Sequence, residues 1–502
     1  MVVKSEINIL TRIENIKEKY GSVEGNCDCD YVEETIGAAG LWQVGISSTA
    51  ALTRYIAIGN MTSIVFLTPT TDFICTDLND NGSMKAENNT CYENCRKYDF
   101  RSEVMETSLI SDFQLICGKA WLGSFTQSVL MLGFVLGASF FGWLSDRFGR
   151  RKAIISSSVL NIVSMIPTSF APDYWTFTVL RFIVGFASGG SFIVCVPIIM
   201  EIIGKRYREV AGALCVLPDG IGEALLAPFA YFLPKWNTYL LGFSMSCIFI
   251  LFLICFLPES PRWLISNGKV DQAIEEMTRA AKFNRLPTTD IREIVMRSVE
   301  AMKIKENEKT TENYLDFFRT KRLCILTVST LFTWIVVGTC YYGIYQYMTL
   351  LGFDVFVTVA ILGLIQVPLC PVEIAINKMF SRKISIYGTL LVTGFTMVIL
   401  IFTPNGHWAT TLFGVIGFSA SSITFVVLYV YTAELYPTPL RSMAYGMTSA
   451  AAKMGAMVAP FIANIRPVWI PSSVFAVLSL TAVLTCFILP ETKGRNLKDV
   501  VD

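Results

Sequence analysis

Apolar stretches of about 20 residues alternate with polar segments along most of the chain. A helix of that length crosses the hydrocarbon core of a bilayer, so each stretch predicts a transmembrane helix. The pattern therefore predicts an all-α membrane protein with twelve spans. They lie at residues 41–68, 120–144, 153–171, 176–200, 209–232, 238–257, 323–346, 353–379, 384–403, 409–432, 442–465 and 468–489.

Two long polar segments interrupt this series and divide the chain. Residues 69–119 separate the first two spans, and residues 258–322 separate the sixth span from the seventh. Apolar residues recur at helical spacing around 270–282 and 291–304, which predicts short helices in the second segment. The predicted organisation is a cytosolic segment at 1–40, six-helix bundles at 41–257 and 323–489, a cytosolic linker at 258–322 and a cytosolic tail at 490–502.

The composition supports a membrane protein and argues against an enzyme. Hydrophobic residues make up 53% of the 502 residues and charged residues 16%, whereas a soluble protein carries about 25% charged residues. The sequence contains no phosphate-binding loop, nucleophile–base pair or metal-binding motif, and its one histidine, His407, falls in a predicted turn. Residues 1–35 are polar, so no cleavable signal is expected. We expect no enzymatic activity, cofactor, metal site or nucleic-acid partner.

Three pairs of short motifs recur at one common spacing of about 232 residues. The pairs are Asp146–Lys152 with Asn377–Lys383, Glu201 and Arg208 with Glu434 and Arg441, and Pro258–Ser260 with Pro490–Thr492. Each motif stands at the end of a predicted span. This common spacing predicts a duplicated half, folded as two pseudo-symmetric six-helix bundles, as in transporters built from structural repeats.

Basic residues gather on one side of the predicted membrane. They follow the second, fourth and eighth spans and include Arg147, Arg150–Lys152, Lys205, Arg206, Arg208, Lys378, Arg382 and Lys383. This excess of positive charge predicts that the side faces the cytosol, together with both termini. Residues 69–119 then face outside, and their sequons at Asn81 and Asn88 agree with that orientation. We expect a multi-pass glycoprotein of the plasma membrane.

Four of the 14 cysteines lie in or beside the polar segment 69–119. They are Cys75, Cys91, Cys95 and Cys117, whereas most of the others lie within apolar stretches. Clustered cysteines in a glycosylated extracellular segment predict two disulfide bonds, with three pairings open. A zinc site is the less favoured alternative.

Carboxylates and arginines at the cytosolic span ends form a candidate conformational latch. Guanidinium groups at this rim can bind carboxylates and helix ends of neighbouring spans, and Gly149 permits a tight turn. Such contacts are expected to hold the two bundles in one conformation and to break in the other. We expect a weaker latch in the second half, where Asn377 and Ser381 replace the Asp and Gly of the first copy. The alternative is that the basic residues only mark the topology. The latch candidates are Asp146, Arg147, Gly149, Arg150, Arg151, Glu201, Arg208, Glu259, Arg262, Glu434 and Arg441.

Several of these motifs resemble those of a known family. Gly142-Trp-Leu-Ser-Asp-Arg-Phe-Gly-Arg-Arg-Lys152 resembles the loop signature of the major facilitator superfamily. Leu257-Pro-Glu-Ser-Pro-Arg-Trp-Leu264, Glu434-Leu-Tyr-Pro-Thr-Pro-Leu-Arg441 and Asp316-Phe-Phe-Arg-Thr320 are similar to motifs of the organic cation/anion/carnitine transporter family. Sugar porters share parts of this set but lack the long cysteine-bearing outer loop, which is shorter here than the family usually shows. The resemblance covers essentially the whole chain and implies alternating-access transport of small organic ions.

Charged residues inside the predicted spans are the candidate substrate-binding residues, because intramembrane charges are costly. Lys453 lies within the eleventh span. At this place, cation transporters of the resembled family tend to carry Asp, and anion and carnitine transporters tend to carry Arg. Gln366 stands where cation transporters carry an acid in the eighth span. Both departures favour an organic anion or a zwitterion over a simple cation.

Further charges in the spans complicate this interpretation. Asp219 and Glu223 are four residues apart in the fifth span, so they share a helix face. The repeat spacing places them at a depth comparable to that of Lys453. Arg54 lies in the first span and Glu373 in the eighth. A cavity holding these groups could bind a molecule that bears both charges. The alternative is that the groups pair with one another and only hold the bundles together.

Aromatic residues of the seventh span are further candidates. They are Trp334, Tyr341, Tyr342 and Tyr345. Aromatic faces attract ammonium groups, and phenol groups form hydrogen bonds with polar ligands. The family's substrate cavity uses aromatic residues of this span. The alternative is ordinary packing or lipid contact.

The leading hypothesis is a carrier of small organic anions or zwitterions, similar to carnitine, that works by alternating access. The expected partners are this substrate and the lipid bilayer, with a coupling ion or an exchanged solute, and we expect a monomer. An organic-cation carrier is the alternative. It predicts uptake that survives Lys453→Ala and fails with Asp219→Asn. A receptor or scaffold without transport is the third hypothesis, and it would lack the polar cavity.

Overall fold

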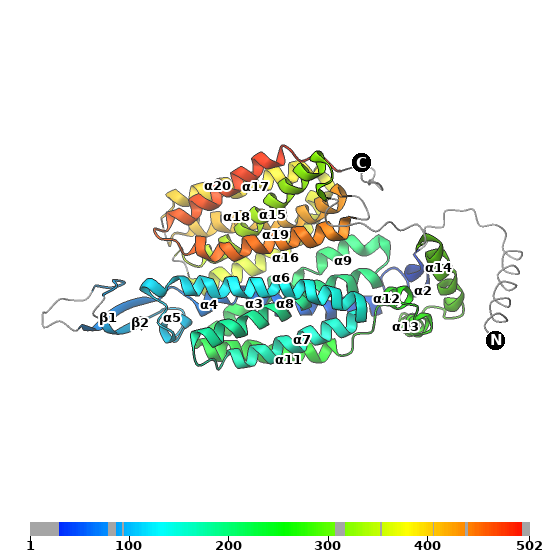
Figure 1. Ribbon diagram of the computed structural model, residues 1–502, viewed down its shortest axis with the longest axis horizontal. Coiled ribbons are helices and arrows are strands. Elements are labelled where there is room, and N and C mark those ends of the chain that lie inside the picture. The colour runs from blue at the N-terminus through cyan, green and yellow to red at the C-terminus, as the bar shows by residue number, and fades with distance from the viewer. Residues whose placement is uncertain are drawn as a thin grey trace, which may run out of the picture.

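The computed structural model describes residues 30–78, 87–92, 95–306, 317–351, 354–404, 406–436 and 440–493. Its long helices run side by side in two bundles (Figure 1). The first bundle contains α3 (Leu41–Thr62), α4 (Ile64–Leu67), α6 (Trp121–Phe148), α7 (Arg150–Thr168), α8 (Tyr174–Ile202), α9 (Arg208–Leu214), α10 (Leu217–Phe232) and α11 (Trp236–Ile254). The second contains α15 (Lys321–Met348), α16 (Val355–Met379), α17 (Arg382–Phe402), α18 (Trp408–Leu435), α19 (Arg441–Ala463) and α20 (Trp469–Cys486). With α3 and α4 counted as one span, and likewise α9 and α10, these helices coincide with the predicted spans to within a few residues.

The two ends of the bundles carry different extensions (Figure 1). We call them the hairpin end and the linker end. The hairpin end carries β1 (Asp72–Leu78), β2 (Cys95–Arg101), α5 (Leu109–Asp112) and η1 (Cys117–Lys119). The linker end carries α2 (Tyr31–Ile36), η2 (Lys205–Tyr207), α12 (Pro261–Ser266), α13 (Val270–Phe283) and α14 (Ile291–Glu306). The helices α13 and α14 lie where the sequence pattern predicts them, whereas the antiparallel pair β1–β2 was not predicted.

Ten helices of the described chain are long and apolar enough to span a membrane. The helices α7 and α19 are comparable in length but carry more polar residues, among them Asn161 and Lys453. These polar groups are buried against neighbouring helices rather than exposed to lipid. The amide of Asn161, for example, donates to the hydroxyl of Ser188 in α8 at 2.8 Å. Packing inside a bundle therefore allows α7 and α19 to be membrane spans, although their hydropathy alone does not identify them as such.

The fifth span is interrupted inside its bundle. The helix α9 ends at Leu214 and α10 begins at Leu217. Pro218 has no N–H, which suits the first turn of a helix, where backbone donors lack intrahelical partners. Asp219 therefore lies in the first turn of α10, where the helix dipole favours a negative charge. Discontinuous helices of this kind form ion and substrate sites in transporters.

Glycines allow α6 and α8 to pack backbone against backbone. A Cβ added to Gly137 would lie 1.8 Å from the carbonyl oxygen of Phe186. One added to Gly189 would lie 2.1 Å from the carbonyl oxygen of Phe134. Small residues at a crossing permit van der Waals contact between helices in a bilayer, where the hydrophobic effect does not drive association.

We expect Gly137→Ala to lower the unfolding temperature of the purified protein, because the added methyl forces α6 and α8 apart. Overpacking of this kind costs about 1–3 kcal/mol. Gly142→Ala in the same helix is the matched control, since no atom lies within 4 Å of its added Cβ. That variant should unfold at the wild-type temperature or slightly above it. Equal unfolding temperatures for the two variants would contradict the prediction.

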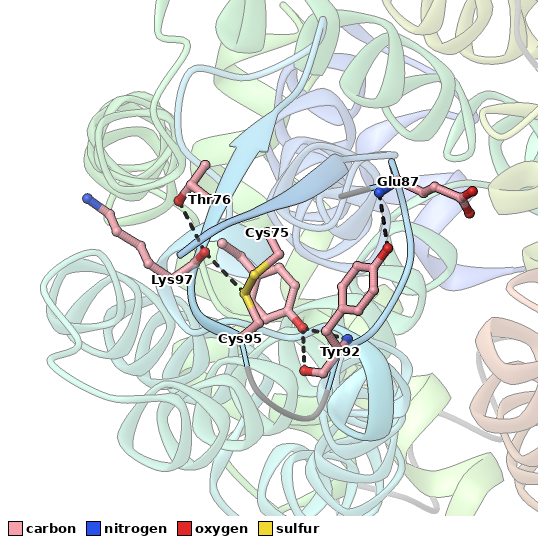
Figure 2. The surroundings of a disulfide bond; sticks show 7 residues. Cys75, Thr76, Glu87, Tyr92, Cys95 and Lys97 are labelled. Carbon is pink, nitrogen blue, oxygen red and sulfur yellow. Dashed lines mark hydrogen bonds between the residues drawn. A yellow bond between two sulfur atoms is a disulfide. The ribbon is translucent and has the colours of Figure 1, made fainter. Parts of the chain in front are cut away.

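Two disulfide bonds stabilise the hairpin and its loop. Cys75 pairs with Cys95, and Cys91 pairs with Cys117. Figure 2 shows the first bond joining the two strands. The four cysteines are those predicted to form disulfides, and this is one of the three pairings that the sequence left open.

The structure describes one of the two predicted glycosylation sites. Asn88 is exposed in a turn between the strands. Asn81 lies outside the described residues. Glycosylation at both positions stays a prediction.

Candidate functional site

The repeated motifs form equivalent ion-pair clusters at the linker end. In the first bundle, Arg150 of α7 binds Glu201 of α8 at 2.8 Å and Asp146 of α6 at 2.6 Å. Glu259, just before α12, accepts hydrogen bonds from the backbone N–H groups of Arg150 and Arg151 at 2.7 and 3.2 Å. A carboxylate at this position caps the free N–H groups of α7 and complements the helix dipole.

Gly149 makes this close approach sterically accessible. Its φ is +111°, and an added Cβ would lie 2.2 Å from the carboxylate of Glu259. The indole N–H of Trp263 in α12 donates to the backbone oxygen of Asp146 at 2.8 Å. The predicted tight turn is therefore present, and it joins α6, α7 and α12.

The second bundle repeats the arrangement. Arg382 binds Glu434 at 3.0 Å. Glu491 accepts hydrogen bonds from the backbone N–H groups of Arg382 and Lys383 at 3.0 and 3.1 Å. The Nη1 of Arg382 donates to the backbone oxygen of Asn377 at 2.5 Å, where the first bundle has the ion pair with Asp146. The second copy thus retains the arginine–glutamate pair and the capping glutamate, and it lacks the ion pair that Asp146 makes in the first.

Arg208 and Arg262, both latch candidates, bind an aspartate that lies outside the repeated motifs. Arg208 donates to Asp30 at 3.0 Å. Arg262 donates to Asp30 at 2.6 Å and to the backbone oxygen of Glu201 at 2.9 Å. The side chain of Asp30, just before α2, is only 3% exposed. Asp30 thus attaches α2 to the first bundle. It lies outside the repeated motifs, so no sequence pattern predicted its role.

Two further latch candidates lie outside the clusters. Arg147 is exposed, with its guanidinium 5.7 Å from the ring of Trp143. The Nε and Nη2 atoms of Arg441 are buried and have no hydrogen-bond partner among the described residues. Among the described ion pairs, Glu434 binds the arginine at the start of α17, and none contains Arg441.

Each cluster lies within one bundle. The first joins α6, α7, α8 and α12, and the second joins α16, α17, α18 and the segment after α20. Among the ion pairs of the described residues, none connects the two bundles. In this structure the predicted latch is therefore not a contact between bundles. The clusters hold the helix ends of each bundle together, which suits rigid-body movement.

Glu491 gives the second cluster a pH dependence. Burial raises its pKa, but hydrogen bonds from the backbone N–H groups of Lys493, Lys383 and Arg382 outweigh burial and hold the pKa below its ordinary value of 4.5. A carboxylate with a lowered pKa stabilises the fold above its unfolded-state pKa, and this contribution is lost as the pH falls through the folded-state pKa.

We therefore expect Glu491→Gln to lower the unfolding temperature at neutral pH and to have little effect at pH values below the folded-state pKa. Unfolding temperatures of the purified protein across an acidic pH series measure this difference. Glu300→Gln, at an exposed position of α14, is the control and should leave the whole profile unchanged. A Glu491→Gln profile parallel to that of the wild type would contradict the assignment.

Two of the charges predicted inside the spans form an ion pair. The Nε of Arg54 in α3 donates to Oδ1 of Asp219 in α10 at 3.0 Å, and Nη2 donates to Oδ2. Their side chains are 8% and 7% exposed. The guanidinium also lies 4.0 Å from the ring centre of Phe192 in α8. This two-point contact neutralises both groups inside the first bundle, as the pairing alternative expected for them.

Lys453 of α19 has no carboxylate partner within the described part of the chain. Its Nζ donates to the hydroxyl of Tyr342 at 2.5 Å. It also lies 4.6, 4.7 and 5.4 Å from the ring centres of Phe134, Tyr342 and Phe192. Phe134 and Phe192 belong to the first bundle, so the ammonium lies between the bundles. Aromatic faces attract a cation but leave its charge uncompensated.

Glu223 of α10 is the corresponding unpaired acid. Its Oε2 accepts a hydrogen bond from the amide of Gln366 in α16 at 2.5 Å. Its Oε1 is buried without a hydrogen-bond partner among the residues that the structure describes, and the residue is 0% exposed. Gly220 and Gly363 permit this approach of α10 to α16, since a Cβ on Gly220 would lie 2.6 Å from the carbonyl oxygen of Gly363. The contact joins the two bundles.

Two tyrosines connect these unpaired charges. The rings of Tyr341 and Tyr342 have centres 5.1 Å apart, and the hydroxyl of Tyr341 donates to Gln366 at 3.4 Å. A continuous path therefore runs from Lys453 through both tyrosines and Gln366 to Glu223. The structure thus places an uncompensated cation and an uncompensated acid at the two ends of one polar, aromatic path between the bundles.

The remaining candidates have other surroundings. Trp334 packs against Tyr429 within the second bundle, with ring centres 4.7 Å apart. Glu373 faces the hydroxyl of Ser422 in α18 at 3.5 Å. Neither Trp334 nor Glu373 lies on the path between Lys453 and Glu223. Tyr345 is buried one turn beyond Tyr341 on α15.

Two aromatic residues near the buried charges and one further buried charge were not predicted. Phe134 and Phe192 lie in apolar stretches, where a phenylalanine gives no functional signal. Arg181 of α8 is 1% exposed and donates to the backbone oxygen of Asn60 and the hydroxyl of Ser63, each at 3.2 Å. A charged residue inside a predicted span was the signal that could have identified it.

The sequence is similar to known transporters over most of its length. Residues 119–460 match the family described as Major Facilitator Superfamily. Solute carrier family 22 member 13 of Homo sapiens is 33% identical over 399 residues, which cover 78% of this chain and 71% of that protein. The chain belongs to solute carrier family 22. This family member is therefore a multi-pass membrane transporter of small organic ions and not an enzyme.

Other relatives of this solute carrier 22 protein bear different names. Solute carrier family 22 member 1 of Oryctolagus cuniculus is 31% identical, with 79% of this chain and 71% of that protein covered. The Drosophila melanogaster protein named organic cation transporter protein is 29% identical, with 84% and 78% covered.

Solved structures confirm the fold. The proton:xylose symporter XylE bound to 6-bromo-6-deoxy-D-glucose aligns with a TM-score of 0.63 at 19% identity, covering 91% of this chain and 98% of that one. Its inward-open form from E. coli aligns with a TM-score of 0.64 at 16% identity, covering 90% and 97%. The predicted arrangement of two six-helix bundles is thus the major facilitator fold.

Proposed function

We propose that this solute carrier 22 protein transports a small organic anion or zwitterion whose anionic group binds Lys453. The observation that carries the proposal is the unequal pairing of the buried charges. Arg54 and Asp219 neutralise each other, whereas Lys453 has a hydroxyl and aromatic rings around its ammonium and no carboxylate contact among the described residues. A buried charge without a counter-charge is unfavourable, so an anionic substrate group beside Lys453 would be strongly stabilised.

The other end of the path suits a substrate that also carries an ammonium group. Glu223 offers an unpaired carboxylate, and Tyr341 and Tyr342 offer aromatic faces between it and Lys453. A molecule similar to carnitine bears a carboxylate and a quaternary ammonium. Its two charges would compensate those of Lys453 and Glu223 together.

The position of the site supports transport by alternating access. Lys453 contacts rings of the opposite bundle, and Glu223 contacts Gln366 across the same interface. Toward the hairpin end, the hydroxyl of Ser124 donates to the backbone oxygen of Pro460 at 3.1 Å and closes the two bundles against each other. A substrate held by both bundles would bias their relative orientation, because its contacts differ between the two states.

Uptake of three compounds of nearly equal shape tests the charge preference. The zwitterion is L-carnitine. The anion is its isostere, in which a neutral quaternary carbon replaces the nitrogen. The cation is its carboxamide, in which a neutral amide replaces the carboxylate. Vesicles containing the purified protein should accumulate the zwitterion and the anion above protein-free vesicles, and not the cation. Accumulation of the cation alone would overturn the proposal.

An organic-cation carrier is the second candidate, and one contact favours it. Glu223 of α10 reaches Gln366, which stands where cation transporters of the resembled family tend to carry an acid. A carboxylate thus lies near the expected place but comes from the other bundle. This candidate predicts uptake of the carboxamide that fails with Glu223→Gln and survives Lys453→Met.

A further inference from the structure

The charges between the bundles sum to zero when no substrate is bound, although Lys453 and Glu223 make no contact with each other. Arg54 and Asp219 form a neutral pair, and the other charged residues that the structure describes along the path are one cation, Lys453, and one acid, Glu223. Arg181 makes its own contacts with Asn60 and Ser63, apart from this path. A region of low dielectric tolerates ions only when its total charge is close to zero.

Substrates of different charge disturb this neutrality differently. A zwitterion adds no net charge and can compensate both free groups. A simple anion compensates Lys453 but leaves the carboxylate of Glu223 as an isolated buried negative charge. Protonation of Glu223 removes that charge, whereas the alternative is a Born penalty of several kcal/mol for a buried unpaired ion.

We propose that Glu223 is a proton-binding site, and that a simple anion bound at Lys453 enters together with one proton on Glu223 while a zwitterion enters without it. The inference rests on the proposed function. The proton comes from the aqueous solution on the open side, converts the carboxylate into the neutral acid, and leaves to the solution on the other side. The transport of a monovalent anion is then electroneutral.

The contacts of Glu223 suit a group that gains and loses a proton. Gln366 holds Oε2, whereas the buried Oε1 has no partner in the described chain and is free to carry the proton. The acid lies between α10 and α16, which belong to different bundles, so opening of this interface exposes it to water. In the closed interface the same acid is 0% exposed.

The charged and titratable groups that face Glu223 are either paired or neutral, so Glu223 is the group expected to change protonation when an anion binds. On its own helix, Asp219 is compensated by Arg54 of α3. From α15 it faces tyrosines, Tyr341, Tyr342 and Tyr345, which are neutral at physiological pH. From α16 it faces Gln366, which does not titrate.

Proton uptake on ligand binding tests the inference directly. Purified full-length protein in a weakly buffered solution is mixed with the carbon isostere of carnitine, and the pH change is compared with the amount bound. We expect about one proton taken up per bound anion, and none on binding of L-carnitine. Glu223→Gln should bind the anion without proton uptake. Glu373→Gln is the matched control, since its acid faces Ser422 in the second bundle, and it should retain the uptake.

The affinity for the anion should change accordingly. By linkage, binding that takes up one proton strengthens up to about tenfold for each unit by which the pH is lowered. L-carnitine affinity, and anion affinity in Glu223→Gln, should stay flat between about pH 6 and 8. If the wild-type protein binds the anion through Lys453 without proton uptake, the inference is overturned while the proposed function stands. Proton uptake that persists in Glu223→Gln would also overturn it. Failure of both compounds to bind in a Lys453-dependent manner would reject the proposed function as well.

Discussion

Replacing Lys453 by methionine is expected to lower the uptake of L-carnitine and of its carbon isostere by at least about 30-fold. Truncating one partner of a buried charge pair costs about 2–5 kcal/mol, because the other charge is left unpaired in the site. Methionine fills a similar volume and keeps contact with the rings of Phe134 and Phe192, so the substitution removes mainly the charge. Initial uptake rates into vesicles, normalised to the amount of protein, measure the effect.

The same substitution should not destabilise the fold. Without substrate, Lys453 is a buried ammonium that lacks a carboxylate contact in the described structure. When the lysine charge is removed, protonation of Glu223 in its proposed role leaves no unpaired buried ion. Lys453→Arg keeps the sign of the charge and should retain part of the uptake. Loss of uptake at an unchanged or higher unfolding temperature is therefore the expected signature. Uptake of both compounds within a few-fold of wild type in Lys453→Met would exclude Lys453 as the anion site.

Asp219→Ala is expected to reduce the stability of the first bundle by about 3–5 kcal/mol, because it leaves the guanidinium of Arg54 buried without a counter-charge. This loss should lower both the yield of folded protein and the unfolding temperature. Arg54→Met should have an effect of the same kind, since it leaves the carboxylate of Asp219 unpaired. Thermal unfolding of the purified variants measures both.

The double variant Arg54→Met with Asp219→Leu separates the ion pair from simple packing. Removing both charges together leaves no unpaired ion, so much of the stability lost in either single variant should return. Losses that add up in the double variant would show that the two residues act independently. The double variant should also be folded, so its uptake can show whether this ion pair contributes to transport.

These contacts change how loss of function at Asp219 is to be interpreted. On the sequence alone, failure of Asp219→Asn distinguished a cation carrier from an anion carrier. In the structure Asp219 is the partner of Arg54, so its loss impairs the fold in either case. Glu223 is the acid whose substitution distinguishes a cation carrier from an anion carrier, because its carboxylate has no positively charged partner among the described residues.

The spans and the duplication could be predicted because both are local properties of the sequence. An apolar stretch is long enough to cross a bilayer whatever surrounds it, and the repeated motifs mark the same span ends in each half. The contacts within those motifs could not be predicted in the same way. Glu201 and Arg208 lie seven residues apart, yet Glu201 binds Arg150 and Arg208 binds Asp30. The chain leaves α8 between them and turns through η2, so their spacing along the sequence does not describe their separation in space.

The sequence by itself determined the membrane-spanning helices, the two-bundle fold and the set of charges inside the spans. Only the tertiary structure decided which of those charges cancel. Arg54 meets Asp219 because α3 packs beside α10. Lys453 and Glu223 come from opposite bundles, and the contacts described for them are with neutral groups. The physical reason is that electrostatic pairing depends on distances between helices, which are set by close packing at small residues such as Gly220 and Gly363.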